Sequence, residues 1–221
     1  MSFISKLVIL WYSFAMNNDE LHDLRHSLAH LLGAAVTTLF PNAKNTIGPA
    51  IEHGFYYDFD MGDTKITEDD LPALETKMRE ILKEWSTFTK IEVSEREARE
   101  HFKDNPYKLE LIDEIVANGT PITLYTSGTF TDLCRGGHIE DTKTINPKAF
   151  KLDRIAGAYW RGDESNKMLT RIYGLAFNTP DELTVYLTLQ EEAKKRDHRK
   201  LGKEMELFSF SDYVGTGLPL W

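Results

Sequence analysis

Two pairs of side chains suited to metal binding or acid–base chemistry share one spacing in this sequence. His26 and His30 lie four residues apart, and Cys134 and His138 repeat that separation more than a hundred residues later. Imidazole and thiolate groups are the ligands that zinc and similar metals select. The same groups can also hold and activate a water molecule without any metal. The pattern therefore predicts either a zinc site or a metal-free hydrolytic site, and both remain open at this point.

The first pair is predicted to lie on a helix. Leucine and other apolar residues recur at helical spacing over residues 19–40, Asp19 can cap the start, and Pro41 ends the pattern. Side chains four residues apart stack on one face of a helix. We therefore expect His26 and His30 to share one face, beside the apolar stripe and at the wall of a cleft.

The second pair is predicted to flank a turn. Residues 121–172 are rich in β-branched and aromatic residues, which favours strands. Arg135, Gly136 and Gly137 interrupt this pattern, and glycine is typical of turns. Cys134 and His138 are therefore expected on either side of a glycine turn.

The remaining segments predict an α+β fold with helices packed on an antiparallel sheet. Further helices are expected at residues 67–86, 94–102 and 107–117, and a long last helix from Pro180 to about Met205. Extended segments are expected at residues 46–59, 90–93, 150–152, 158–160 and 168–173.

Composition excludes some classes of protein. With 221 residues the chain can form one large domain or two small ones, and its single cysteine excludes an internal disulfide framework. The net charge of −9 argues against a protein that coats nucleic acid non-specifically. A local basic run near the C-terminus is the exception; it comprises Lys194, Lys195, Arg196, His198, Arg199, Lys200 and Lys203.

The first sixteen residues differ from the rest. Residues 7–14 are apolar but too few to cross a membrane. They fit either a signal-peptide core or a non-native start, with Met16 as the real beginning. We favour the second interpretation, which predicts a cytoplasmic protein.

Five segments together resemble the threonyl-tRNA synthetase family. They are RHSLAHLLGAAV, IGPAIEHGFYYDFD, TDLCRGGHIEDT, AYWRGDESNKMLTRIYG and EEAKKRDHRKLGKEMELFSF, which occur in this order over residues 22–221. The resemblance implies a non-matching segment at residues 1–18 and, at residues 19–178, the editing domain that threonyl- and alanyl-tRNA synthetases share. It also implies a linker helix at residues 179–207 and the start of a class II catalytic core at residues 208–221.

The activity implied by this resemblance is editing. The family joins threonine to its tRNA with ATP, and the ATP-binding core is absent from this sequence. The retained domain is expected to hydrolyse seryl-tRNA(Thr), because a synthesis site that admits threonine cannot strongly reject the smaller serine. The expected partner is the acceptor end of tRNA(Thr), a separately encoded catalytic core is a further candidate partner, and no membrane is expected. A monomer is expected, since the family dimerises through the missing core.

The resemblance also assigns roles to residues. His26, His30, Cys134 and His138 match the editing cleft, with His26 or His30 positioning water or acting as general base. The family usually has proline at the position of Gly137, so a looser turn is expected before His138. Editing is expected to need no cofactor; zinc on the same four residues is the alternative.

Three more residues match the family site. Lys108 is expected to stabilise the oxyanion or the departing 3′ oxygen. Asp132 would orient a histidine or bind the seryl amine, and Tyr57 would line the pocket. Without the resemblance, Lys108 would be read as part of a solvated helix face, Asp132 as a turn cap and Tyr57 as a core residue.

Two other functions stay open. One is a non-catalytic domain that binds tRNA, with the basic run or Arg161, Lys167 and Arg171 on the phosphates. The other is a zinc-dependent deacylase of the alanyl-tRNA type. A covalent role for Cys134 is also open.

Overall fold

The computed structural model describes residues 18–210 and 219–220. The interpretation of residues 1–16 therefore lies outside the described residues, as does most of the segment assigned to a catalytic core. The chain divides into two compact units, one reaching Pro180 and the other starting at Asp181. The chemistry-bearing residues all lie in the first unit.

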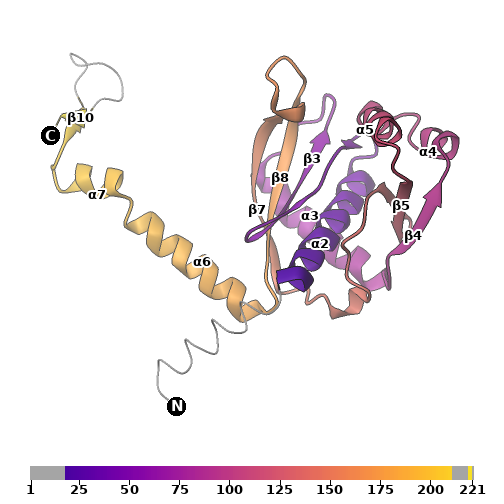
Figure 1. Cartoon of the computed structure of the whole chain (residues 1–221). Coiled ribbons are helices and arrows are strands. Elements are labelled where there is room, and N and C mark those ends of the chain that lie inside the picture. The colour runs from indigo at the N-terminus through magenta and orange to yellow at the C-terminus, as the bar shows by residue number, and fades with distance from the viewer. Residues whose placement is uncertain (1–17, 211–218, 221) are drawn as a thin grey trace. The chain divides into compact units, whose positions relative to one another are not determined.

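A five-stranded antiparallel sheet organises the first unit (Figure 1). Its strand order is β1–β3–β8–β7, and β2 pairs with the opposite end of β3 from β1. The strands are β1 (Lys44–Asn45), β2 (Ala50–Ile51), β3 (Gly54–Asp60), β7 (Phe150–Tyr159) and β8 (Met168–Ala176). This arrangement, together with the helices, confirms the predicted α+β class.

Strand β7 corrects one prediction. Residues 150–152 and 158–160 were expected to form two strands, but the backbone stays paired with β8 from Phe150 to Tyr159. A register shift between Leu152 and Arg154 accommodates the irregular middle. The hydrophobic alternation stops at Asp153, whereas the backbone hydrogen bonds that make a strand do not depend on side-chain polarity.

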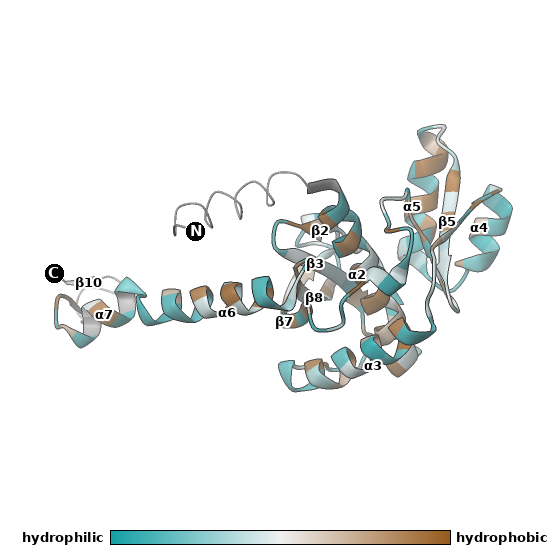
Figure 2. Ribbon diagram, turned by 90° about the horizontal axis from the view of Figure 1, so that it is seen from below, coloured by the Kyte–Doolittle hydropathy of each residue, from teal (hydrophilic) through white to brown (hydrophobic). Residues whose placement is uncertain are grey.

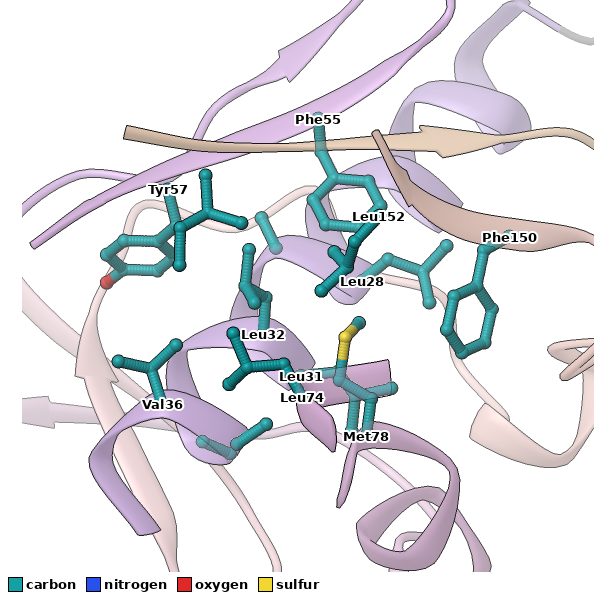
Figure 3. Packing of buried hydrophobic residues seen from close by; sticks show 14 of the residues in the cluster. Leu28, Leu31, Leu32, Val36, Phe55, Tyr57, Leu74, Met78, Phe150 and Leu152 are labelled. Carbon is teal, nitrogen blue, oxygen red and sulfur yellow. The ribbon is translucent and has the colours of Figure 1, made fainter. Parts of the chain in front are cut away.

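The main core lies between this sheet and two helices, α2 (Asn18–Leu39) and α3 (Leu71–Glu84). Figure 3 shows side chains of both helices packed against those of the strands. Phe55, Tyr57 and Phe59 alternate along β3 and are fully buried, as expected for residues on the inner face of a strand. The turn η1 (Glu68–Asp70) precedes α3 and carries a capping box of Thr67 and Asp70.

A second, smaller core belongs to a three-stranded sheet and two helices. The strands are β4 (Thr89–Val93), β5 (Ile122–Ser127) and β6 (Phe130–Leu133), and the helices are α4 (Glu95–His101) and α5 (Pro106–Ala117). Figure 2 shows α4 as mostly hydrophilic and α5 as carrying more hydrophobic residues. Ser94 caps α4 and Asn105 caps α5, each by accepting a backbone N–H with its side chain.

The second unit corrects another prediction. The single helix expected from Pro180 to Met205 is two helices, α6 (Pro180–Lys195) and α7 (His198–Glu204). Asp197 stands directly before α7, and aspartate at that position favours the start of a new helix.

Four short elements complete the structure: η2 (Thr142–Thr144), η3 (Trp160–Gly162), β9 (Ser209–Phe210) and β10 (Pro219–Leu220). Within the described part of the chain, no helix is both long and apolar enough to cross a membrane.

Candidate functional site

A cavity of about 510 Å³ lies where the two cores of the first unit meet. Its wall combines α2, the loop before β3, α5 and the segment that follows β6. The residues that line this cavity include His26, His30, Gly48, Lys108, Asp132 and Cys134. The fold therefore brings two of the histidines and the sole cysteine to one concave site.

The His/Cys quartet is assembled at this site. Its members are His26, His30, Cys134 and His138. Each offers one ligand atom, and these four atoms all lie within 4.8 Å of one another. The sulfur of Cys134 lies 3.5 Å from Nε2 of His26 and 3.3 Å from Nε2 of His138. Helix α2 supplies two members through its i, i+4 spacing, and the loop after β6 supplies the others.

The proton position on His26 follows from its hydrogen bond. Its Nδ1 lies 3.0 Å from the carbonyl oxygen of Gly137, and a carbonyl only accepts. Nδ1 therefore carries the proton, and the lone pair of the neutral ring is on Nε2. That nitrogen faces Cys134 and is available to accept a proton or bind a metal.

His138 and His30 have different surroundings from His26. Nδ1 of His138 lies 3.3 Å from the hydroxyl of Ser27, and its ring stacks on Phe88 with the ring centres 4.2 Å apart. Ser27 also accepts the backbone N–H of Ile139, which anchors the loop to α2. His30 is buried, and its Nδ1 has no hydrogen-bond partner in the described structure.

Burial keeps the quartet uncharged. Desolvation lowers the pKa of His26 and, with the neighbouring histidines, lowers that of His30 well below its ordinary value and that of His138 to about 2. Desolvation also raises the pKa of the Cys134 thiol to about 11. In the absence of a metal the group is three neutral imidazoles and a protonated thiol, which disfavours Cys134 as a nucleophile.

The donor set fits a zinc ion. Ligand atoms around tetrahedral zinc lie about 3.3–3.6 Å apart, given bonds of roughly 2.0–2.3 Å. The two sulfur–nitrogen distances of 3.5 Å and 3.3 Å match that spacing, whereas the four ligand atoms together lie within 4.8 Å of one another, so a bound zinc ion would draw some of them closer. The unpartnered Nδ1 of His30 is a further sign that the site can accept another atom.

A second, polar group adjoins the quartet. Nζ of Lys108 lies 2.5 Å from Oδ1 of Asp132, and both side chains are almost fully buried. Tyr57 donates its hydroxyl proton to Oδ2 of Asp132, and burial raises the pKa of Tyr57 well above its ordinary value. Lys108 therefore does not lie on a solvated helix face, and Asp132 has side-chain partners beyond its own turn.

Tyr57 reaches the site from the core. Its ring stacks against Phe59, is fully buried and does not line the cavity; its hydroxyl is the part that contacts Asp132. Its position thus differs from the pocket wall that the resemblance implied.

Three residues that the sequence did not single out hold the others in place. They are Ser27, beside His138, and the asparagines Asn45 and Asn105. Asn105 precedes Pro106, which is a recognisable helix-start signal. Sequence spacing does not mark Ser27 or Asn45 as site residues, because they contact His138 and Asp132, which lie far along the chain.

The turn before His138 has a conformation that requires glycine. Gly136 has φ +116° and Gly137 has φ +83°, both in the region that favours glycine. Proline, with φ near −65°, cannot adopt the angle seen at Gly137. The Gly137 carbonyl oxygen accepts a hydrogen bond from His26, which ties the turn to α2.

The three basic residues considered for phosphate contact are already ion-paired. Arg171 makes two hydrogen bonds to Asp58, and Lys167 contacts Asp60 at 2.8 Å. Arg161 contacts Glu110 at 2.5 Å and also pairs with Glu114. Members of the basic run are paired as well, since Lys195 and Arg196 contact Glu192 and Lys200 contacts Glu204, so ion pairing does not separate the two groups of candidates.

Comparison with known proteins agrees with the resemblance. Residues 122–173 match the family described as the threonyl and alanyl tRNA synthetase second additional domain. The chain is 55% identical over 201 residues to the threonine–tRNA ligase of Borrelia turicatae (strain 91E135) and 55% identical over 198 residues to that of Borrelia duttonii (strain Ly). It is 54% identical over 200 residues to that of Borreliella burgdorferi (strain ZS7).

These alignments cover 90% of this chain and 34% of each relative. The chain thus spans about a third of the length of the curated relatives it matches. The resemblance to threonyl-tRNA synthetases and the presence of an editing-type domain are confirmed. The matched residues 122–173 include Asp132, Cys134 and His138.

Proposed function

We propose that this chain hydrolyses the ester bond of seryl-tRNA(Thr) and so removes serine attached in error. The observation that carries the proposal is the meeting of His26, His30 and Cys134 of the quartet with Lys108 and Asp132 at one cavity. The relatives are named threonine–tRNA ligases, and such an enzyme needs a second site of this kind. One methyl group separates threonine from serine and discriminates by only about 1–3 kcal/mol in a binding pocket.

The hydrolysis requires a base for the attacking water. Nε2 of His26 carries a lone pair, because the ring proton is held at Nδ1 by the Gly137 carbonyl. We assign the base role to His26, with His30 completing the wall that confines the water. Burial lowers the pKa of both rings, so both are neutral at neutral pH, and the larger lowering at His30 makes that ring the weaker base of the two.

The charge that develops on the substrate needs a cation. Lys108 lines the cavity and is held there by Asp132. An ammonium group fixed in a poorly solvated site stabilises an oxyanion or a departing 3′ oxygen more strongly than one in water. The terminal adenosine and the seryl group would enter from the open side of the cavity.

The four quartet residues would also be the ligands of a zinc ion. Bound there, zinc would polarise the ester carbonyl and lower the pKa of water. The unpartnered Nδ1 of His30 favours this second candidate, a zinc-dependent deacylase of the alanyl-tRNA type.

One assay separates the candidates. The protein is incubated with seryl-tRNA(Thr), threonyl-tRNA(Thr) and alanyl-tRNA(Ala), each with and without a chelator, and the released amino acid is measured. The proposal expects selective serine release that is insensitive to the chelator and about 10²-fold or more slower in His26→Ala. His101→Ala, which changes an exposed histidine of α4, is the matched control and should keep the full rate.

The other outcomes decide against the proposal. Chelator-sensitive release of alanine supports the zinc-dependent deacylase. Absence of turnover by folded protein that still binds tRNA supports a non-catalytic binding domain. Cys134→Ala adds a further distinction, because a covalent mechanism would lose all turnover, whereas a pocket role leaves a measurable rate.

A further inference from the structure

Asn45 occupies the centre of the polar group that joins the two cores of the first unit. It is the last residue of β1, pairs with Phe59 of β3, and is nearly buried. Its side-chain nitrogen Nδ2 donates to the hydroxyl of Tyr57 at 3.0 Å and to Oδ1 of Asp132 at 3.2 Å. The side-chain amide of Asn45 thus contacts both Tyr57, which belongs to the main core, and Asp132, which pairs with Lys108.

Asn105 fixes the orientation of that amide. Its Nδ2 donates to the backbone oxygen of Asn45 at 2.8 Å and to the side-chain Oδ1 of Asn45 at 3.3 Å. The opposite orientation of Asn45 would place its NH₂ against the NH₂ of Asn105 and its oxygen against the Asp132 carboxylate. Only the observed orientation satisfies every partner.

The same asparagine also sets the start of α5. Oδ1 of Asn105 accepts the backbone N–H of Lys108, which lies in the first turn of this helix. A continuous path of hydrogen bonds therefore runs from Lys108 through Asn105 and Asn45 to Asp132. The path crosses between the small core, which carries α5 and β6, and the main core, which carries β1 and β3.

The Asp132 carboxylate accepts hydrogen bonds from four donors, and Asn45 is one of them. Oδ1 accepts from Lys108, from Asn45 and from the backbone N–H of Leu133, while Oδ2 accepts from Tyr57. The Tyr57 hydroxyl in turn gives its only proton to Asp132 and accepts from Asn45. Without Asn45, the remaining donor near that hydroxyl is Lys108 at 3.5 Å, a weak contact.

We propose that Asn45 is a positioning residue for the cleft: together with Asn105 it ties the two cores and holds Tyr57, Asp132 and Lys108 in one arrangement. Its importance for the reaction rests on the proposed function; its action on Tyr57 and Asp132 does not. Asn45 has no contact with the cavity and touches no reacting atom. It acts through the groups that do.

Kinetics provide the first test. Asn45→Ala is expected to lower kcat for seryl-tRNA(Thr) about tenfold with little change in KM, a loss typical of one hydrogen bond to a charged group. Tyr57→Phe should lower it similarly, and the double variant should be no slower than the slower single variant, because both changes break the same path. The matched control is Asn42→Ala, an exposed asparagine in the preceding turn, which should keep the full rate.

A spectroscopic test does not depend on activity. The ¹³Cζ resonance of Tyr57 reports the hydrogen bonds of its hydroxyl and can be assigned by its absence in Tyr57→Phe. It should move in Asn45→Ala and, by a smaller amount, in Asn105→Ala, and stay in place in Asn42→Ala. If Asn45→Ala does not fold, Asn45→Ser, which keeps a small polar group, serves for the same comparison.

The outcomes separate the two proposals. If the wild-type protein releases no serine but the Tyr57 resonance moves as expected, the editing function is wrong and the positioning role stands. If serine is released and Asn45→Ala leaves both kcat and the resonance unchanged, the positioning role is wrong. Additive losses in the double variant would also contradict it.

Discussion

At the scale of single residues, the buried pair of Lys108 and Asp132 is the feature with the largest expected energetic effect. Both side chains are nearly inaccessible to water, and the charged atoms are 2.5 Å apart. A buried ion pair adds little net stability, but removal of one partner leaves an unpaired charge in a poorly solvated site. Lys108 and Asp132 should therefore depend on each other for stability as well as for chemistry.

Lys108→Met is expected to lower the free energy of unfolding by about 3–5 kcal/mol, because it leaves the Asp132 carboxylate without its cation. The double variant Lys108→Met with Asp132→Asn should lose less than the sum of the two single variants, with a coupling of about 1–3 kcal/mol. Urea unfolding of the four proteins gives these values.

The exposed pair of Lys103 and Glu100, whose charged atoms are 3.1 Å apart, is the control for this cycle. Its coupling should stay below about 1 kcal/mol, the usual limit for a surface pair. Equal couplings for the two pairs would show that the buried pair is not desolvated as described.

A second residue-level prediction concerns Gly48, in the loop between β1 and β2. A Cβ atom at this position would overlap the ring of Tyr57. Gly48→Ala should therefore displace that ring, lower the free energy of unfolding by about 1–3 kcal/mol and slow serine release. Thermal unfolding and the deacylation assay measure the two effects.

Gly157→Ala is the matched change. There a Cβ atom would meet the sulfur of Met168 at 2.8 Å, and that side chain is 57% exposed and free to move aside. Stability and serine release should both stay near the wild-type values. A Gly48→Ala protein that behaves like Gly157→Ala would contradict the close packing of the loop on Tyr57.

At the scale of elements, the position of α5 decides where Lys108 lies. The helix is held at its start by Asn105, and its Tyr107 donates its hydroxyl to Asp60 at the end of β3. Asp60 also pairs with Lys167. A carboxylate at the end of the main sheet thus fastens the helix that belongs to the small core.

This contact makes a pH-dependent contribution to stability. Burial by itself would raise the pKa of Asp60, but hydrogen bonds from Lys167, the Gly62 backbone and Tyr107 outweigh it and hold the pKa below 3.8. Because the folded-state pKa is the lower one, the contribution is present above the unfolded pKa and is lost as pH falls through the folded pKa.

The difference in free energy of unfolding between the wild-type protein and Asp60→Asn should therefore be largest above about pH 5 and shrink toward zero below the folded pKa. Urea unfolding from pH 7 to pH 3 gives the profile. A difference that grows on acidification would mean that Asp60 is destabilising in its charged form.

At the scale of the whole molecule, charge is distributed unevenly. The net charge is −9, yet the basic run of the C-terminal third lies in α6, α7 and the residues between them. An acidic protein binds RNA only through a local basic surface, and such binding weakens steeply with salt. We expect this run to bind the tRNA phosphates.

Exchange of two exposed lysines, Lys194→Glu with Lys195→Glu, should weaken tRNA binding. It should also make the slope of log Kd against log salt shallower by about one for each phosphate that the protein no longer neutralises. Lys148→Glu, at an exposed loop of the first unit, should leave that slope unchanged. Binding titrations at several salt concentrations measure both. An equal effect of the two changes would indicate a general charge effect.

The sequence by itself determined the class of fold, the two longest helical patterns of the first unit and the residues of the quartet. These depend on short-range spacing: apolar residues every third or fourth position bury one face of a helix, and His26 and His30 share a face for the same reason. The family resemblance added Lys108, Asp132 and Tyr57, which no local pattern marks. The continuous strand β7 and the break before α7 were missed because side-chain polarity is an incomplete guide to backbone pairing and helix starts.

Only the tertiary structure decided how the parts of the cleft are held. Asn45 meets Asp132 across 87 residues of sequence, and Ser27 meets His138 across 111. It also showed that Lys108 is buried and that His26 carries its proton on Nδ1. The physical reason is that hydrogen bonds and desolvation depend on which atoms surround a group in space, and for these residues the surrounding atoms come from distant segments that sequence spacing does not relate.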